Sequence, residues 1–362
     1  MQYELMNKNV SLLMFACLRN DYGETDVHEL EWRTDLSPLG YRTLLSFLER
    51  RRAPKHRKHI QQLLEKYGCD DLEGFLRVTH ALSLNDSFWV REAGSPLTWE
   101  DVSLYRNPFN EVISLAAFAG DFSGDSFSST SPEFGTDGRF AKCWVREGRD
   151  IFLIKSGSDL YEIEPLSEFL ASQVARLICP EAVAYDLSFF HGRLVSRCRL
   201  FTSEEVGLVK MSELEPSART IPELLAVYES VGAGDTFRRM CVLDSIILNV
   251  DRHLGNFGML VNNDTQNVAG AAPIFDHNRS LLFDLDTAQL EDPDWYIRRC
   301  RPRIGADFTL TARGLMTDAI RSDLKNMAGF SFRQHDTIQA DALRLRRLSA
   351  VVNRQIEHIL KA

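Results

Sequence analysis

The chain has 362 residues, of which 44% are hydrophobic and 26% are charged, fractions close to those of soluble globular proteins. This length exceeds what one small core organises, so we expect two packed regions or one bilobal domain with an N-terminal elaboration. With 42 Lys and Arg against 51 Asp and Glu, the formal net charge is −9, which argues against an affinity of the whole protein for nucleic acid or anionic membranes.

The cysteines and the N-terminus bear on the cellular setting. The seven cysteines are scattered and contain no Cys-x-x-Cys pair, so neither a disulfide framework nor a structural zinc site is predicted. No uninterrupted apolar run reaches about 18 residues, and no cationic stretch leads into an apolar run and cleavage site. We therefore expect a reducing, cytoplasmic setting without a membrane or direct nucleic-acid partner.

Residues 1–120 are expected to form an α/β region of unknown role. The apolar run from Val10 to Ala16 is typical of either a buried strand or a short buried helix. A helical stretch is predicted from Tyr41 to about Leu64, interrupted at Pro54. It carries a basic cluster of Arg50, Arg51, Arg52, Lys55, His56, Arg57, Lys58 and His59. We interpret this cluster as a solvated face, with binding of nucleic acid or an acidic partner as the alternative.

Residues 121–202 are expected to form a small β-rich lobe. The segment between Gly120 and Gly138 is rich in Ser, Gly and Asp, a composition typical of a mobile loop. Two strand-like runs follow, Ala141 to Arg146 and Ile151 to Lys155. The turn-prone residues between them predict a β-hairpin.

The next elements continue this lobe and lead into a helical region. Apolar residues from Pro165 to Ile178 recur at i, i+3 and i+4, which predicts an amphipathic helix with Pro165 in its first turn. Strand-like segments run from Ala182 to Phe190 and from Arg193 to Phe201. Residues 203–362 are expected to be mainly helical, with one helix from Thr236 to Asn249 and a long final helix.

The densest polar cluster follows the Thr236 to Asn249 helix. It reads Asn-Val-Asp-Arg-His-Leu-Gly-Asn-Phe-Gly, and Pro-Ile-Phe-Asp follows after a turn-rich insert. In-line phosphoryl transfer needs a carboxylate to orient the acceptor hydroxyl, oxygen ligands for divalent cations and a cation on the nucleotide phosphates. Asp251, then Asn256, then Asp276 follow the order of a kinase catalytic base and two magnesium ligands.

A lysine on an upstream strand should supply the cation. Ile-Phe-Leu-Ile-Lys has this form, so Lys155 is predicted to contact the phosphates of ATP. The carboxylate that fixes the lysine is expected near or on the following helix, where Glu162, Glu164 and Glu168 are candidates. Glu168 is favoured because it lies within the helix, beside the apolar face.

The order of these motifs over residues 128–300 resembles the HipA family of bacterial serine/threonine kinases. More distantly it is similar to the phosphatidylinositol 3-kinase superfamily, whose catalytic loop also contains Asp-Arg-His-x-x-Asn. The resemblance implies an α+β, bilobal, protein-kinase-like fold with a small β-rich N-lobe (121–202), a mainly helical C-lobe (203–362) and an α/β N-terminal extension. It also implies Asp251 as catalytic base, Asn256 and Asp276 as ligands of Mg²⁺, and Lys155 on ATP.

The same resemblance implies further features. A phosphate-binding loop is expected from Ser128 to Lys142, although it lacks a clean glycine-rich pattern, and an adenine-binding hinge from Arg197 to Thr202, with Phe201 beside the nucleotide. Family members act on protein serine or threonine, can be toxins paired with a small antitoxin, and can inactivate themselves by autophosphorylation. Residues 1–120 show no evident match to the N-terminal module of the family. The serines available for autophosphorylation are Ser128, Ser129 and Ser131.

Two other classes of protein stay open. A catalytically weak pseudokinase would bind nucleotide and act as an interaction protein. A metal-dependent phosphohydrolase would use Asp251, His253, Asp276 and His277 to hold paired cations that activate water. The nine histidines show no other cluster, which disfavours the hydrolase. A P-loop NTPase is excluded because Gly-x-x-x-x-Gly-Lys-Ser/Thr is absent.

Overall fold

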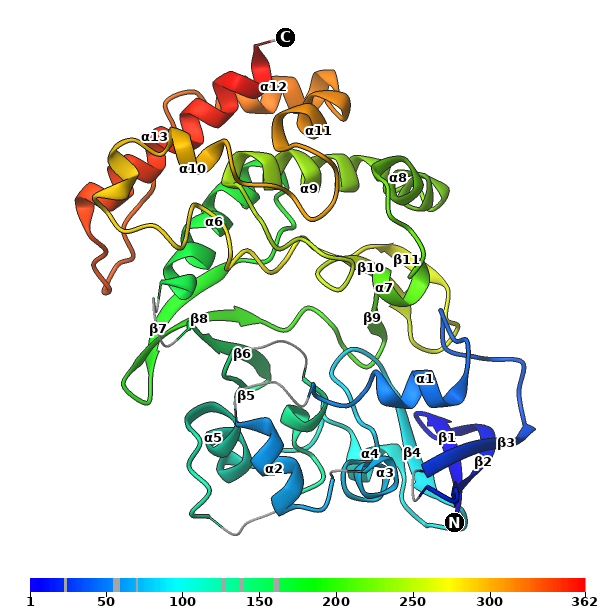
Figure 1. Ribbon diagram of the computed structural model, residues 1–362. Coiled ribbons are helices and arrows are strands. Elements are labelled where there is room, and N and C mark those ends of the chain that lie inside the picture. Colours follow the sequence, from blue (N-terminus) through cyan, green and yellow to red (C-terminus); the bar gives the residue numbers. More distant parts are fainter. Residues whose placement is uncertain are drawn as a thin grey trace. The chain divides into compact units, whose positions relative to one another are not determined.

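The computed structural model describes residues 1–22, 25–54, 59–69, 71–124, 128–136, 140–158 and 163–361 (Figure 1). Unit 1 comprises Met1–Lys155, Leu200–Val209 and Leu260–Ala269, and unit 2 comprises Ser156–Arg199, Lys210–Met259 and Gly270–Ala362. The functional regions 1–120, 121–202 and 203–362 stay a prediction. Several residues of the predicted features lie outside the described residues, namely Lys55, His56, Arg57, Lys58, Glu162 and positions 137–139 of the phosphate loop.

Unit 1 is built on a four-stranded antiparallel sheet in the order β3-β2-β1-β4, with short helices around it (Figure 1). Its elements are β1 (Gln2–Asn7), β2 (Val10–Arg19), β3 (Thr25–Trp32), α1 (Leu44–Glu49), α2 (Ile60–Lys66), α3 (Leu72–Thr79), β4 (Phe88–Glu92), α4 (Trp99–Val102), α5 (Glu111–Ala119), the 3-10 helix η1 (Pro132–Gly135), β5 (Lys142–Glu147) and β6 (Asp150–Ser156), whose last residue belongs to unit 2.

Successive side chains of a strand point to opposite faces, and along β1 and the start of β4 both faces are buried, whereas β3 is mostly exposed. Leu5 of β1 pairs with Val90 of β4, and both join the core beneath α1, α2, α3 and α5. The next pair, Met6 and Trp89, joins a second core that includes Trp99 of α4. The apolar run that begins at Val10 is a strand, β2, which resolves the choice that periodicity left open.

The helical stretch expected from Tyr41 to Leu64 forms two helices, α1 and α2, and Pro54 lies between them, where the interruption was predicted. Both helices are shorter than expected, since α1 ends at Glu49 and α2 begins at Ile60. Arg51, which lies in the break, faces the interior. Its guanidinium is buried and donates to both carboxylate oxygens of Asp86 at 2.7 and 2.8 Å, and to the carbonyls of Ala81 and Phe88 at 2.6 and 2.9 Å. Arg51 therefore belongs to the interior of unit 1 rather than to a solvated basic face.

The hairpin predicted after the Ser-rich segment is confirmed. Strands β5 and β6 pair antiparallel, with Lys142 opposite Lys155, and Gly148 in the turn has a left-handed φ of +61°. The described part of the preceding loop is packed, although its composition suggested a mobile segment. Phe134 lies in the unit 1 core, edge-on to Tyr67 with ring centroids 6.1 Å apart.

The strands β9 (Val206–Lys210), β10 (Gly258–Asn262) and β11 (Val268–Ala271) form a three-stranded sheet in the order β11-β10-β9. The division between the two units passes through each of these strands.

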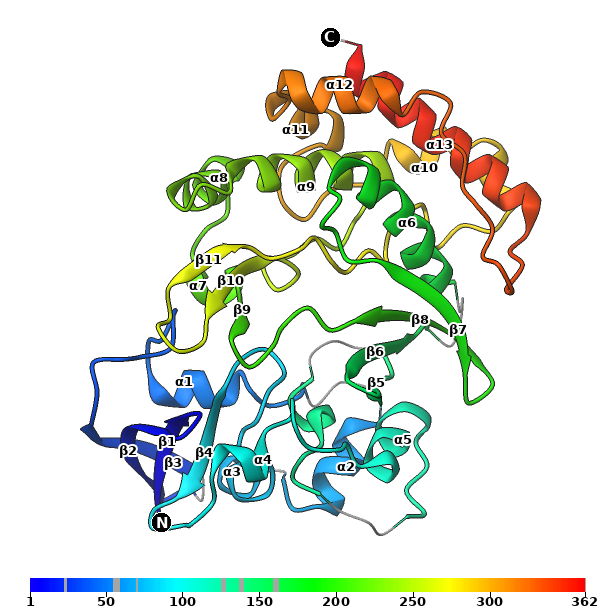
Figure 2. The same ribbon diagram turned by 180° about the vertical axis from the view of Figure 1, so that it is seen from behind.

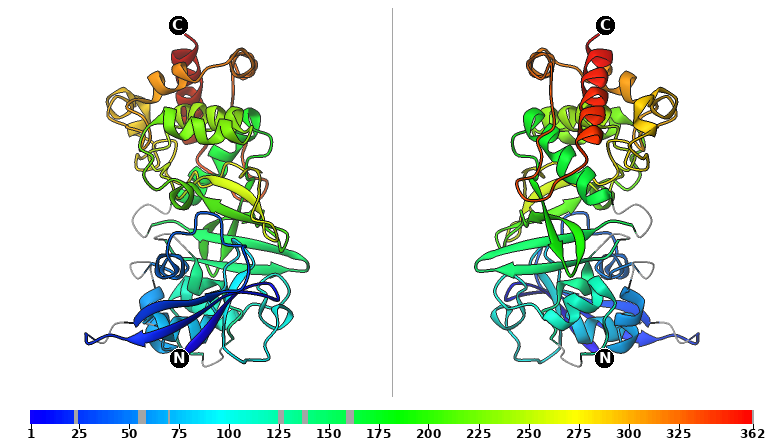
Figure 3. Two further views of the ribbon diagram at one scale, coloured as in Figure 1. Left: turned by 90° about the vertical axis from the view of Figure 1, so that its right-hand side faces the viewer. Right: turned by 90° about the vertical axis from the view of Figure 1, so that its left-hand side faces the viewer.

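Unit 2 is mainly helical. The long helix α9 packs against α6, α8, α11 and α13 (Figure 2), and α13, in red, runs along the end of the unit in the right-hand view of Figure 3. The expected helices from Pro165, from Thr236 and at the C-terminal end, and the strand pair β7–β8, are confirmed. The elements are α6 (Glu164–Ile178), β7 (Tyr185–Phe190), β8 (Arg193–Arg199), α7 (Met211–Leu214), α8 (Ile221–Ser230), α9 (Gly234–Ile247), η2 (Gln289–Glu291), α10 (Asp294–Ile297), α11 (Phe308–Gly314), α12 (Asp318–Asn326) and α13 (Ala342–Leu360).

Among the helices formed by the described residues, none combines the length and the apolar character needed to cross a bilayer.

Arg51 supplies a test of the unit 1 interior. We expect Arg51→Ala to lower the free energy of unfolding by about 3 kcal/mol, because it removes the charged partner of the largely buried Asp86 carboxylate, which keeps only the N–H of Phe88, and one donor to two carbonyls. The measurement is urea unfolding of the full chain. Arg50→Ala is the matched control, since Arg50 is exposed and its loss should change stability by no more than about 0.5 kcal/mol. Equal losses in both variants would contradict the assignment.

Candidate active site

The site begins at the end of α9. The last turns of this helix are apolar and buried, and Leu248 ends it in a left-handed conformation with φ of +54°. Asn249 follows and is buried. Its Nδ2 donates to Asp244 at 3.1 Å, and its Oδ1 accepts the backbone N–H of Asp251 at 3.0 Å. Asn249 therefore fixes the backbone of Asp251 relative to α9.

Arg252 ties three parts of unit 2 together. Its guanidinium, with only 3% of the side chain exposed, donates to both oxygens of Asp244 at 2.9 and 3.0 Å. It also donates to the carbonyl of Asn256 at 2.9 Å and to the carbonyl of Phe275. One side chain thus joins α9, the 251–256 loop and the turn that carries Asp276.

The Asp244 carboxylate keeps Arg252 in its charged form. Burial alone would lower the pKa of Arg252, but the Asp244 carboxylate outweighs this effect and holds the pKa above its usual value. A buried charge of this kind is tolerated only with a close partner and satisfied hydrogen bonds. The positions of the accepting carbonyls are therefore closely defined.

The 251–256 loop is also closed by its own hydrogen bonds. The N–H of His253 donates to the carbonyl of Asp251 at 2.8 Å, and the N–H of Asn256 donates to the carbonyl of His253 at 2.9 Å. The side-chain Nδ2 of Asn256 donates back to the carbonyl of Asp251 at 3.2 Å. This last bond defines which end of the Asn256 amide is the oxygen, so Oδ1 faces away from Asp251.

Asp276 adopts a backbone conformation that few residues accept. Its φ is +62°, in the left-handed region that Asp tolerates better than most residues. Its N–H donates to the hydroxyl of Tyr185 at 3.0 Å. Burial, followed by the Glu168 carboxylate, raises the pKa of Tyr185 well above its usual value, so this hydroxyl stays protonated. Strained conformations of this kind are concentrated at functional sites.

Glu168 lies against the same turn. It is fully buried in α6, its Oε2 accepts the hydroxyl of Ser196 at 2.5 Å, and its Oε1 lies 3.4 Å from the N–H of His277. The helix position that favoured Glu168 in the sequence therefore places it beside the Asp276 turn. An ion pair with Lys155 stays a prediction.

The carboxylate of Asp251 faces two arginines of unit 2. The Nε of Arg303 lies 3.1 Å from Oδ1 of Asp251, and the Nε of Arg279 lies 4.0 Å from Oδ2. Arg303 belongs to the connection between α10 and α11, about fifty residues after the catalytic-loop motif. Neither contact could be inferred from the sequence.

The two histidines of the motif do not form a metal centre. His277 is fully buried with its Nδ1 3.2 Å from Arg252, and partial desolvation lowers the pKa of His253 despite the opposing effect of the Asp251 and Asp276 carboxylates. Within the part of the chain that is described, no three His, Cys, Asp or Glu side chains are grouped so as to hold a metal ion. This does not support the phosphohydrolase alternative.

The donor set does fit magnesium bound with a nucleotide. Mg²⁺ in phosphotransferases is held by one or two protein oxygens together with substrate phosphates and water, rather than by a complete protein cage. Asn256 offers an amide oxygen of defined orientation and Asp276 offers a carboxylate, on segments joined by Arg252.

Lys155 and Phe201, the remaining predicted site residues, belong to unit 1. Lys155 is buried near the end of β6. It lies opposite Lys142 in the β5–β6 register, so the two side chains project from the same face of the hairpin. The segment that carries Phe201 is held in unit 1 by a backbone hydrogen bond, in which the N–H of Leu200 donates to the carbonyl of Ile151 at 2.8 Å. Their relation to Asp251, Asn256 and Asp276 in unit 2 stays a prediction.

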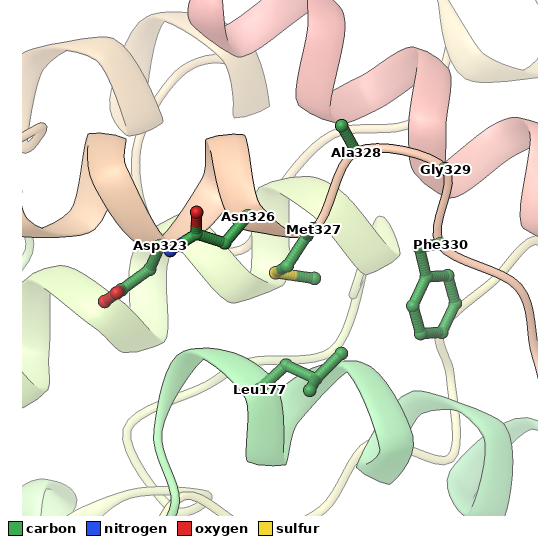
Figure 4. Close-up of a pocket in the computed structure, with 7 residues that line it drawn as sticks. All are labelled: Leu177, Asp323, Asn326, Met327, Ala328, Gly329 and Phe330. Carbon is green, nitrogen blue, oxygen red and sulfur yellow. The ribbon is translucent and has the colours of Figure 1, made fainter.

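A separate depression in unit 2 contains none of the predicted site residues. It has a volume of about 310 Å³ and lies between α6 and the end of α12, where Leu177 points toward the turn after α12 (Figure 4). Its one carboxylate, Asp323, is held by Arg239 at 2.7 Å. We do not assign this depression to the site. It is lined by Leu177, Asp323, Asn326, Met327, Ala328, Gly329 and Phe330.

Sequence reasoning gave no role to Asp244, Asn249, Arg252, Tyr185 or Arg303. A signal existed for Asp244, since it is a carboxylate on the otherwise apolar face of a helix that leads directly into the motif. Asn249 and Arg252 lie inside the motif itself. For Tyr185 and Arg303 the sequence offers no signal, because only folding brings them near the loop.

Comparisons with known proteins support the expected fold. No family model and no curated protein sequence match the chain. HipA of the toxin–antitoxin system of Shewanella oneidensis MR-1, solved with HipB and operator DNA, aligns over 99% of both chains with a TM-score of 0.56 and 10% identity. The Helicobacter pylori proinflammatory kinase CtkA aligns over 60% of this chain and 92% of its own with a TM-score of 0.46 and 16% identity.

The HipA similarity confirms the predicted HipA-like fold and, at its low identity, shows the fold alone. It extends over nearly the whole chain and so includes residues 1–120, where the sequence showed no evident match to the family.

Arg252 provides a test of the site's framework. We expect Arg252→Lys to lower the free energy of unfolding by about 2 kcal/mol, because three N–H groups on one nitrogen cannot replace the four bonds of the planar guanidinium to both oxygens of Asp244 and to two carbonyls. Amide hydrogen exchange should quicken at Asn256 and His277. Arg238→Lys is the control, because Arg238 lies in α9 and forms an exposed pair with Glu229, and it should change stability by less than about 0.5 kcal/mol. An unchanged hydrogen-exchange rate at both amides in Arg252→Lys would contradict the role of Arg252 in holding the two loops together.

Proposed function

We propose that this chain is an ATP- and magnesium-dependent serine/threonine protein kinase of the HipA-like type, with a bilobal kinase arrangement. One observation carries the proposal. Arg252 donates to the carbonyls of Asn256 and Phe275, which holds the 251–256 loop and the Asp276 turn in one framework. The three oxygen-bearing groups that in-line phosphoryl transfer requires lie on these two segments.

Each site residue has its own role in the proposed phosphoryl transfer. Asp251 orients the acceptor hydroxyl and receives its proton, while Asn256 and Asp276 hold Mg²⁺. The bound ion would neutralise charge on the phosphates. Lys155 binds the nucleotide phosphates, with Glu168 as its carboxylate partner. Phe201, in the hinge segment, packs against adenine.

A partner is part of the proposal. The structurally similar HipA was solved with HipB and operator DNA. We infer that this chain also pairs with a small antitoxin that would make the DNA contacts, since the net charge of −9 disfavours direct binding by the kinase. Size-exclusion chromatography of the natively expressed protein tests this inference, and elution as the free chain would count against it.

One observation favours the pseudokinase alternative. Arg303 and Arg279 already face Asp251, and a base occupied in this way is not available to an acceptor. Nucleotide affinity without turnover would select that alternative.

Asp251 and Asp276 should separate catalysis from nucleotide binding. Asp251→Asn should lower kcat by a factor of roughly 10² to 10⁴, because the base is lost, while ATP affinity stays nearly unchanged. Asp276→Asn should lower turnover and also weaken the magnesium-dependent part of ATP binding. Turnover is measured by phosphate transfer from ATP, and affinity by calorimetry with and without EDTA.

Asp336→Asn is the control for these variants, since Asp336 is exposed in unit 2 and should leave both quantities unchanged. Full activity of Asp251→Asn would refute the base assignment. ATP binding that does not depend on magnesium in the wild-type chain would refute the metal assignment.

The Ser-rich segment provides a test of autophosphorylation. Ser131 is 4% exposed and donates to the carbonyl of Ser128 at 2.9 Å, whereas Ser128 and Ser129 are only half-buried. We expect ATP and Mg²⁺ to add phosphate to Ser128 or Ser129 before Ser131, which would place negative charge on the loop expected to bind phosphates. Intact mass and peptide mapping measure this. Asp251→Asn should stay unmodified, and a wild-type chain without phosphate on residues 126–131 would end the idea.

A further inference from the structure

A short segment of unit 2 concentrates positive charge in an acidic chain. Residues 298–303 read Arg-Arg-Cys-Arg-Pro-Arg, whereas the chain as a whole carries a net charge of −9. All four arginines are exposed. We call residues 298–303 the arginine segment.

Three of these arginines form no ion pair within the described residues. Arg301 donates to the carbonyls of Arg298 and Cys300 at 2.7 and 2.8 Å, and Arg299 stacks over the ring of Trp295, with its guanidinium carbon 3.8 Å from the ring centroid. Trp295 is itself 51% exposed. Neighbouring guanidinium groups without carboxylate partners repel one another, so an incoming anion would be attracted to this segment.

The fourth arginine connects the segment to the proposed catalytic base. Arg303 lies 3.1 Å from Asp251. The residues on either side of it, Pro302 and Ile304, line a cavity of about 20 Å³ together with Asp244, Asn249 and Arg252. The arginine segment is therefore anchored against the same framework that positions the 251–256 loop.

We propose that the arginine segment binds acidic residues that flank the acceptor serine or threonine of a protein substrate. The inference rests on the proposed kinase function and names its substrate class. Guanidinium groups bind carboxylates through paired, charge-assisted hydrogen bonds. An acidic residue that takes Arg303 from Asp251 also frees the Asp251 carboxylate for the acceptor hydroxyl, so recognition and activation occur together.

The charge distribution favours a polypeptide over a nucleic acid. Nucleic-acid binding depends on many phosphate contacts along a basic surface, and its affinity falls where the rest of the chain is acidic. Four arginines in one short segment provide enough positive charge to bind a few carboxylates of a peptide. A DNA or RNA duplex is the alternative ligand that the experiment must exclude.

The experiment measures binding to the full-length chain without ATP. The probes are fluorescein-labelled serine peptides, one with Asp and Glu beside the serine and one with Asn and Gln at the same positions. Fluorescence anisotropy should show the acidic peptide binding at least about tenfold more tightly, with the preference falling as salt rises. The triple variant Arg298→Gln, Arg299→Gln and Arg301→Gln should reduce this preference to about twofold or less.

A second triple variant removes the same charge elsewhere in unit 2. Lys325, Arg333 and Arg346 are exposed and form no ion pair within the described residues, and their replacement by Gln should keep the preference. Equal loss in both triple variants would show a general charge effect and overturn the proposal. So would a retained preference in the first variant, or a DNA duplex bound as tightly as the acidic peptide.

The two proposals fail in different ways. Absence of a preference for the acidic peptide, in a chain that transfers phosphate from ATP, overturns the substrate assignment alone. A clear preference for the acidic peptide, in a chain that transfers no phosphate from ATP, overturns the kinase assignment. The arginine segment would then remain a binding site for acidic peptides.

Discussion

The buried pair of Arg252 and Asp244 is the interaction on which the candidate site depends. A guanidinium taken out of water is stable only when its charge and its N–H groups are matched. Asp244 supplies the charge from a helix, and the carbonyls of Asn256 and Phe275 supply acceptors from two loops. Buried apolar neighbours such as Phe257 and Ile274 also hold these loops, and Arg252 adds a polar link between them.

The same requirement supports strained backbone nearby. Leu248, Asp276, Leu281 and Leu282 all have positive φ, which costs about 1 kcal/mol or more for each non-glycine residue. Leu281 is compensated by a backbone bond of 2.6 Å to Ile247, and Asp276 by the hydroxyl of Tyr185. The backbone of these segments is therefore fixed before ligands bind, although the Asp251 side chain is still held by Arg303.

Local patterns predicted the parts of the fold that local physics decides. The apolar spacing from Pro165 and from Thr236 located α6 and α9, and the turn residues around Gly148 located the hairpin that ends at Lys155. The break expected at Pro54 is present between α1 and α2, but the inward turn of Arg51 within it depends on Asp86, a partner 35 residues away. Within the site, motif order indicated Asp251, Asn256 and Asp276. The contact of Arg303 with Asp251 forms because a segment distant in sequence folds against the 251–256 loop. No local sequence pattern predicts such a contact.

The packing of Phe134 has a consequence for the serine-containing loop beside it. Releasing this loop would expose a ring that is now 1% accessible, at a cost of up to about 3 kcal/mol. That cost corresponds to an opened population of about one molecule in a hundred. Modification of Ser131, which is 4% exposed, would need such a release, whereas Ser128 and Ser129 are already partly exposed.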